Sequence, residues 1–195
     1  MRLALTLVLG GGLLASTVWA LDLPAGDPAA GRKVAGMCRT CHGIDGFAKI
    51  PIAPHIGGEP LGYLAAQLAA FRDGSREHEM MTVVARGLSD QNIADVSAWY
   101  AAHQVSVALP ATADESGAPE HCVACHGAVG LSELEDAPHL AGETNIYIET
   151  QLKAFRSGKR THDVMTTIAQ ELTDEDIRAV ANWYAGVKLE ISAPE

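Results

Sequence analysis

The sequence predicts an all-α protein built from two tandem domains of the same fold. A shift of 84 residues superimposes the second half on the first without a gap, and 29 of the 66 positions from Cys38 to His103 are then identical. Apolar residues recur at helical spacing in both halves, whereas no segment shows the alternation expected of a β-strand. Identity kept in register over this length indicates a tandem duplication, so each half should fold in the same way.

Residues 1–20 are typical of a cleavable export signal. Met1-Arg2 gives a positive start, an apolar run follows, and Val18-Trp19-Ala20 fits the small-x-small rule for cleavage. A membrane-spanning anchor would need about 20 apolar residues, and the run is shorter than that. We therefore expect cleavage after Ala20 and a periplasmic mature protein.

Three main helices are expected in the N-terminal domain, residues 21–106. Asp27 is placed as an N-cap before a proline, which starts a helix that runs into Cys38 and Cys41. A second helix carries an apolar stripe over residues 63–71 and ends at Gly74. A third begins at Ser89, because a serine there can cap the apolar pattern that follows.

The C-terminal domain, residues 107–195, repeats this pattern. Its apolar stripe covers residues 147–155 and ends at Gly158, and its last helix begins at Thr173. The opening helix lacks the Asp-Pro start and should be shorter. Residues 110–117 lose all apolar periodicity, so the linker is expected between about Gln104 and Pro119.

Each half contains two cysteines and a histidine in the same order. The copies read Cys38-Arg39-Thr40-Cys41-His42 and Cys122-Val123-Ala124-Cys125-His126. Covalent haem attachment requires two thiols at this spacing, which add to the haem vinyl groups, and a following imidazole that can ligate the iron. A single copy would also suit a thioredoxin-like redox pair or half of a zinc site. Two copies, each ending in histidine, favour one c-type haem in each half.

The sixth ligand of each iron has two candidates. Met81 and Met165 lie 39 residues after the two motif histidines, whereas the neighbouring Met80 is matched in the repeat by a valine. A thioether opposite imidazole raises the haem potential and suits an electron carrier. His78 and His162 are the competing pair, and bis-histidine ligation would lower the potential.

A further pair of histidines, His55 and His139, follows a proline in each half. A surface position or a contact with a haem propionate is the expectation for both rings. His103 and His121 have no partner in the repeat and receive no role.

Cysteine use and charge narrow the function. All four cysteines belong to the haem motifs, so none remains for a disulfide or as a nucleophile. Without the export signal the chain carries 13 basic and 24 acidic side chains. Such an acidic balance argues against nucleic acid as a partner and favours solubility and docking to basic faces of redox proteins, with peripheral membrane association left open.

The order of the motifs resembles the dihaem cytochrome c4 family. C-x-x-C-H-G-x-x-G is followed by P-x-x-x-G, by Y-x-x-x-Q-L-x-x-F-R-x-G-x-R, by a methionine, by L-(S/T)-D and by W-Y, twice in one chain. The resemblance implies two class I cytochrome c domains packed about a pseudo-twofold axis, each wrapped around a covalently attached haem. It implies that the Pro54 and Pro138 carbonyls accept the N–H of the proximal rings. It also implies electron transfer from a donor of the cytochrome bc1 type to a terminal oxidase.

Two alternatives belong to other functional classes. Similar dihaem chains serve as the cytochrome subunit of flavocytochrome c sulfide dehydrogenases, where a flavoprotein subunit donates the electrons. This chain has no G-x-G-x-x-G fingerprint, so a flavin would have to bind to another polypeptide. A self-sufficient dihaem enzyme, such as a thiosulfate dehydrogenase or a peroxidase, needs cysteine ligation or an open iron position. Ligation by both Met81 and Met165 leaves neither, so we expect a carrier without catalytic residues.

Overall fold

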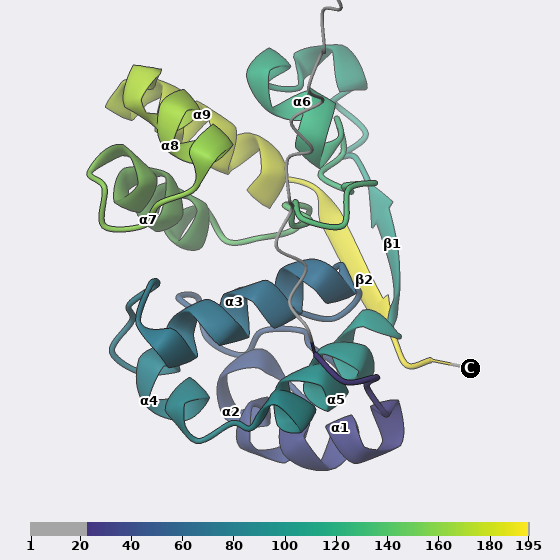
Figure 1. Cartoon of the computed structure of the whole chain (residues 1–195). Coiled ribbons are helices and arrows are strands. Elements are labelled where there is room, and N and C mark those ends of the chain that lie inside the picture. The colour runs from purple at the N-terminus through teal and green to yellow at the C-terminus, as the bar shows by residue number, and fades with distance from the viewer. Residues whose placement is uncertain (1–22, 195) are drawn as a thin grey trace, which may run out of the picture.

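The computed structural model describes residues 23–194, so the expected export signal lies outside the described part. The described chain is mostly helical, as predicted, and forms two halves stacked one on the other (Figure 1). Within residues 23–194, no helix has the length and apolar character needed to cross a membrane.

The N-terminal half contains the three predicted helices and three shorter ones. The first predicted helix ends at Val34 and does not run on through Cys38 and Cys41 as expected, because a 3₁₀-helix and a four-residue helix follow it. Asp27 caps α1 by accepting a hydrogen bond from the Ala29 N–H, and Ser89 caps α5 in a capping box with Asn92. Gly74 ends α3 in the left-handed conformation, as the sequence predicted. The elements are α1 (Pro28–Val34), a 3₁₀-helix (Ala35–Met37), α2 (Arg39–His42), α3 (Leu61–Asp73), α4 (Met81–Arg86) and α5 (Asp90–Ala101).

The C-terminal half repeats this order with a shorter opening. Thr173 caps α9 in a capping box with Asp176. The elements are a 3₁₀-helix (Glu115–Gly117), α6 (Glu120–His126), α7 (Asn145–Arg156), α8 (Asp163–Glu171) and α9 (Asp174–Ala185). In each half the long helices pack on one another, α3 on α5 and α7 on α9, around a small apolar core.

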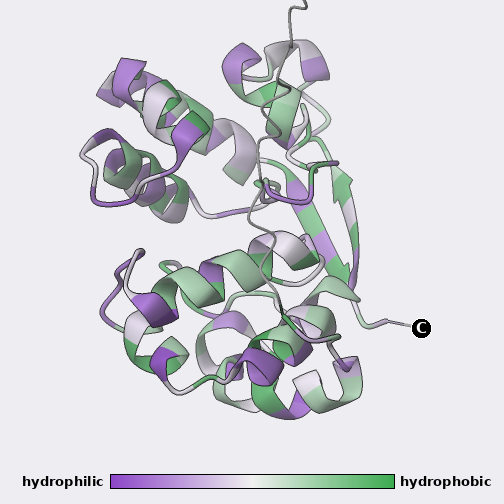
Figure 2. Ribbon diagram, viewed as in Figure 1, coloured by the Kyte–Doolittle hydropathy of each residue, from purple (hydrophilic) through white to green (hydrophobic). Residues whose placement is uncertain are grey.

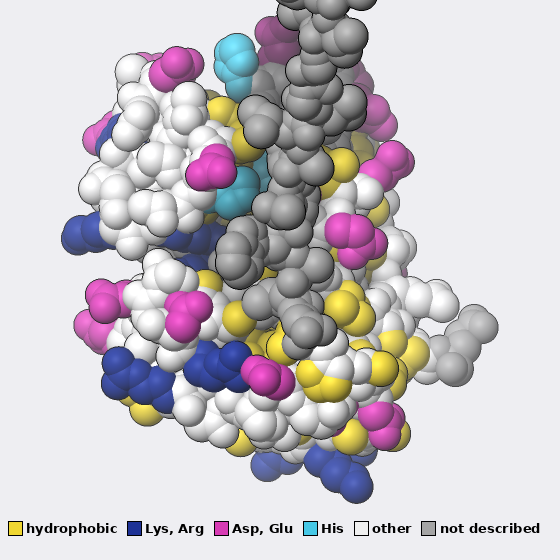
Figure 3. All heavy atoms as spheres, in the orientation of Figure 1, with side chains coloured by type: hydrophobic (Ala, Val, Ile, Leu, Met, Phe, Trp, Pro, Cys, Tyr) yellow, Lys and Arg dark blue, Asp and Glu magenta, His cyan; other side chains and the backbone are white. Residues whose placement is uncertain are grey.

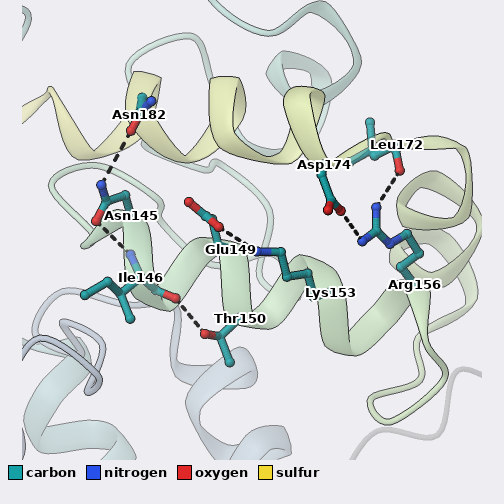
Figure 4. A network of polar contacts seen from close by, with 9 residues as sticks. All are labelled: Asn145, Ile146, Glu149, Thr150, Lys153, Arg156, Leu172, Asp174 and Asn182. Atoms are coloured by element: carbon teal, nitrogen blue, oxygen red, sulfur yellow. Dashed lines mark hydrogen bonds and ion pairs between the residues drawn. The ribbon is translucent and has the colours of Figure 1, made fainter.

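The same arginine contact fastens the last helix in both halves. Arg156 on α7 donates to the Leu172 carbonyl at 2.9 Å and pairs with Asp174 at the start of α9 (Figure 4). In the N-terminal half, Arg72 donates to the Leu88 carbonyl at 3.2 Å and pairs with Asp90 at 2.8 Å. The duplication therefore preserves polar contacts as well as the apolar pattern.

Two strands, which the sequence analysis did not anticipate, join the halves. β1 (Gln104–Ala108) pairs antiparallel with β2 (Lys188–Ser192). Ser106 lies opposite Glu190, its own counterpart in the repeat, so a pseudo-twofold axis passes through the centre of the ribbon. Hydrophobic and hydrophilic residues alternate along β2 (Figure 2), and the alternate positions are half-buried. The expectation of no strand was wrong, and the linker between the halves is structured at its start. The domain boundary at residue 106 falls within β1 and stays a prediction.

Candidate haem sites

The two cysteines of each motif lie on or beside one short helix. In the C-terminal half α6 carries both Cys122 and Cys125, and a separation of three residues puts two side chains on the same helix face. In the N-terminal half Cys38 immediately precedes α2, which carries Cys41. None of the four forms a disulfide within the described residues, and all four are half-buried. Each pair is therefore presented together on one short segment of the chain.

The environment of these cysteines does not favour the thiolate that a reactive dithiol requires. Burial raises the pKa of the Cys38 thiol to about 11, and burial likewise raises the pKa of Cys122. A thioredoxin-like pair needs a thiolate with a depressed pKa. The thioredoxin-like alternative therefore has no support in the environment of these cysteines.

The motif histidines are buried and held in one orientation. His42 Nδ1–H donates to the Pro54 carbonyl at 2.9 Å, and His126 Nδ1–H donates to the Pro138 carbonyl at 2.9 Å, as the resemblance implied. Burial is the largest cause that lowers the pKa of both rings, so they stay neutral. With Nδ1 engaged, Nε2 of each ring carries the free lone pair that a metal requires.

A glycine directly after each histidine lets the chain turn away from the pocket. Gly43 and Gly127 have φ of +75° and +73°, which side chains of L-residues rarely adopt. A Cβ on Gly127 would lie 2.3 Å from the Leu131 carbonyl oxygen. Any larger residue here would displace the loop that leads to Pro138.

The two candidate methionines take equivalent positions. Met81 is the first residue of α4 and Met165 lies in the first turn of α8, and both are half-buried. By contrast, Met80 is 61% exposed and its counterpart Val164 is 50% exposed. Among the alternatives that the sequence left open, Met80 therefore points to solvent.

The competing histidines bond to the backbone near the starts of two helices: His162 is the N-cap of α8, whereas His78 lies two residues before Met80, the N-cap of α4. His162 Nδ1 accepts the backbone N–H of Met165 at 3.3 Å, and His78 Nδ1 accepts that of Met81 at 3.4 Å. Both rings are exposed. Burial is the main cause of the lowered pKa of His42, the bond to the Pro54 carbonyl opposes it, and the nearby His78 lowers the pKa further. His162 has the same effect on the pKa of His126. The segment that carries each methionine therefore lies near the motif histidine of its own half.

His55 and His139 cross the boundary between the halves, which the sequence analysis did not anticipate. His55 Nε2–H donates to the Gly142 carbonyl at 3.1 Å while its Nδ1 accepts the Ala48 N–H at 3.0 Å. His139 makes the equivalent contact with the Gly58 carbonyl at 3.0 Å. Both rings must be neutral to accept at Nδ1, and burial lowers the pKa of both. Each ring bonds to a carbonyl of the opposite half, and such a contact becomes visible only when the two halves are placed together.

Comparison with known proteins agrees with this arrangement. Residues 118–188 match the family model described as Cytochrome c. Cytochrome c4 of Pseudomonas aeruginosa is 34% identical over 184 residues, which cover 84% of this chain and 90% of that protein. The crystal structure of reduced recombinant cytochrome c4 from Pseudomonas stutzeri superimposes with a TM-score of 0.73 at 30% identity, over 84% of this chain and 100% of that chain. The chain belongs to the cytochrome c4 family.

The family relationship establishes the cofactors and the kind of function. Cytochrome c4 proteins are electron carriers with two covalently bound c-type haems, and the present chain has a donor set that fits one haem in each half. Bound haem supplies an iron that alternates between the ferrous and ferric states. The chain's own part is to hold the ring of His42 or His126 through a proline carbonyl. The predictions of the family, of two class I cytochrome c domains and of two haems are confirmed.

One relative carries a different functional name. A protein of Thiomonas intermedia named thiosulfate dehydrogenase electron acceptor is 34% identical over 182 residues, which cover 83% of this chain and 83% of that protein. A protein named cytochrome c4 and a protein named thiosulfate dehydrogenase electron acceptor are thus similar to this chain to the same degree, 34% identity.

Proposed function

We propose that this member of the cytochrome c4 family is an exported carrier that moves electrons in the periplasm between respiratory complexes. In each half the two cysteines hold the haem, and the axial ligands are His42 with Met81 and His126 with Met165. The observation that carries the proposal is the equivalence of the two sites: each pairs a buried histidine, fixed by a proline carbonyl, with a half-buried methionine at a helix start.

The direction proposed for the electrons is from a donor of the cytochrome bc1 type to a terminal oxidase. The supporting features are the histidine–methionine donor set, which gives a high potential, and the acidic chain, whose formal net charge is −10. Membranes of the source organism provide the test. The reduced protein should be oxidised by the terminal oxidase and its oxidised form should be reduced by the quinol-oxidising complex. If membranes neither oxidise the reduced protein nor reduce the oxidised protein, the proposal is contradicted.

Export after Ala20 is tested separately. The haem-loaded protein purified from the periplasmic fraction should begin at Leu21. A protein that retains residues 1–20 would contradict the proposed cleavage while leaving electron transfer untouched.

A second candidate is the electron-accepting subunit of a larger oxidoreductase. The relative named thiosulfate dehydrogenase electron acceptor favours this class, and a flavocytochrome c sulfide dehydrogenase is the other member considered. Purification from the source under native conditions distinguishes the candidates. Stoichiometric co-elution with a haem enzyme or with a flavoprotein favours the subunit, and a single chain favours the free carrier.

A further inference from the structure

Two glutamates are buried where the halves meet. Glu59 follows Gly58 and Glu143 follows Gly142, so the two occupy equivalent positions in the repeat. They are 5% and 3% exposed. No lysine, arginine or histidine side chain within residues 23–194 makes an ion pair with either carboxylate. Glu143 Oε2 has no hydrogen-bond partner in the described structure. Buried, unpaired carboxyl groups at matched positions are costly, and cost of this kind is often connected with function.

Each glutamate contacts a peptide group of the opposite half. Glu59 Oε2 accepts the backbone N–H of His139 at 2.9 Å. Glu143 Oε1 accepts the backbone N–H of His55 at 2.7 Å. The contacts therefore cross, from the N-terminal half to the C-terminal half and back.

These peptide groups are the ones that hold the haem-binding histidines. The N–H of His139 and the carbonyl of Pro138 belong to one amide, and that carbonyl accepts from His126 Nδ1 at 2.9 Å. In the same way, the amide between Pro54 and His55 joins Glu143 to His42, with 2.9 Å between His42 Nδ1 and the Pro54 carbonyl. The N–H and C=O of a trans amide point in opposite directions, so one amide can connect two groups in line. The described chain has no cis peptide.

We propose that each buried glutamate is a positioning residue that tunes the haem of the opposite half through this shared amide: Glu59 acts on the haem held by His126, and Glu143 acts on the haem held by His42. The inference rests on the proposed ligation of the two irons by these histidines. An ionised carboxylate polarises the amide, makes the proline carbonyl a stronger acceptor and leaves more negative charge on the imidazole. A more electron-rich imidazole stabilises ferric iron and lowers the potential.

The surroundings of the two carboxyls set the pH range in which this control operates. Burial raises the pKa of Glu59 to about 8, although the His139 N–H opposes the effect. Burial also raises the pKa of Glu143 well above its usual value, and the charge of Glu59 adds to the shift. Beside Glu59 the titratable groups are His139, Glu133 and Glu135. Beside Glu143 they are His55 and Tyr147, and the charges of Arg76 and Arg160 also act on Tyr147.

The sign of the pH dependence follows from the charge. Below the pKa of Glu59 the group is neutral and the potential of the C-terminal haem is high. As pH rises through about 8 the carboxylate forms and that potential falls. By linkage, reduction of the haem raises the pKa of the carboxyl and promotes uptake of a proton. The chain would thus move protons with electrons at the boundary between its halves.

The test is a redox titration of both haems at several pH values between about 6 and 10, a range that brackets the raised carboxyl pKa. In the wild type the potential of the C-terminal haem should fall as pH rises. Glu59→Gln keeps the acceptor oxygen but cannot ionise, so this haem should keep its high potential across the range. The N-terminal haem should still show a fall in potential, at a lower pH than in the wild type, because the charge of Glu59 no longer raises the pKa of Glu143. In Glu143→Gln, the N-terminal haem should keep its high potential across the range, while the potential of the C-terminal haem should still fall as pH rises. The NMR signal of the His126 Nδ1–H should move with pH in the wild type and stay constant in Glu59→Gln.

Glu133→Gln is the matched control, because Glu133 lies beside Glu59 but is exposed and touches no proline–histidine amide. It should leave both pH profiles unchanged. Retention of the pH-dependent fall at the C-terminal haem in Glu59→Gln, loss of that fall at the N-terminal haem in the same variant, or an equal effect of Glu133→Gln would overturn the proposal. So would a pH-independent wild type, which needs no variant at all. The near-infrared sulfur-to-iron band, recorded first, checks methionine ligation itself and separates its failure from that of the tuning.

Discussion

At the scale of single residues, two adjacent methionines differ in both pattern and exposure. Met81 is matched by Met165 in the repeat and is half-buried at the start of α4, whereas Met80 is matched by a valine and is exposed. Met81→His should abolish the near-infrared sulfur-to-iron band of one haem. The potential of that haem should drop by a sizeable part of the roughly 0.8 V over which axial ligands act. Spectroelectrochemistry measures both effects.

The control is the exposed neighbour. Met80→Ala should leave the band and both potentials as they are. Loss of the band in Met80→Ala with retention in Met81→Ala would show that the ligand is assigned to the wrong methionine.

The buried glutamates should also affect stability. Between about pH 4.5 and 8 the folded chain keeps a proton on Glu59 that the unfolded chain releases, so the stability of the fold declines as pH rises through this window. In Glu59→Gln the free energy of unfolding should fall less over this window, by up to about a few kcal/mol, as measured by denaturant titration at each pH. The exposed Glu135→Gln should reproduce the wild-type slope, and a steeper slope in Glu59→Gln would speak against a neutral Glu59 in the folded chain.

The sequence predicts the residues that bind the haems but not the residues that connect the two halves. The haem motifs can be recognised from the sequence because two thiols and an imidazole lie within five consecutive positions. His55 and Glu143 lie 88 residues apart in the chain, and no pattern within one half indicates that they touch. The signal that was present is the repetition of the pair His-x-x-x-Glu after each proline.

At the scale of elements, the helices were predictable because each carries its own start and stop signals. Ser89 and Thr173 cap α5 and α9 as expected, and Gly74 ends α3. The strands were not predicted, because five residues with two apolar positions give a weak signal. Within residues 23–194, each strand also pairs only with the strand of the other half. Val105 and Leu189 nevertheless hold equivalent places in the repeat, which was an available clue.

The turn after α6 allows a prediction about glycine. Gly127→Ala would force a Cβ into the Leu131 carbonyl at positive φ, so the fold should lose about 1–3 kcal/mol and melt at a lower temperature. Thermal unfolding followed by circular dichroism gives the measurement. Gly36→Ala is the control, since no atom lies within 4 Å of a Cβ built there. An unchanged or raised melting temperature for Gly127→Ala would mean that the turn tolerates a side chain.

At the scale of the whole molecule, charge governs encounter with partners. The chain has a formal net charge of −10, and acidic side chains are scattered over both halves of the face seen in Figure 3. Electron exchange with a basic partner should slow as ionic strength rises, because salt at about 0.15 M limits the range of attraction between exposed charges to about 8 Å. Stopped-flow rates at increasing salt test this, with a neutral small-molecule reductant as the control. Rates that ignore salt would exclude electrostatic steering.

The register of the ribbon also bears on ancestry. Ser106 pairs with Glu190, and the crossed contacts of His55 and His139 obey the same axis, which is how two identical chains meet in a symmetric dimer. The molecule thus has the form of a homodimer whose subunits have been fused. Residues 107–195 produced alone with haem should self-associate through β2, but two Glu190 side chains would then face each other and repel. Glu190→Ser, which restores the residue found in β1, should strengthen that dimer in sedimentation equilibrium, and a half that stays monomeric in both forms would argue against descent from a dimer.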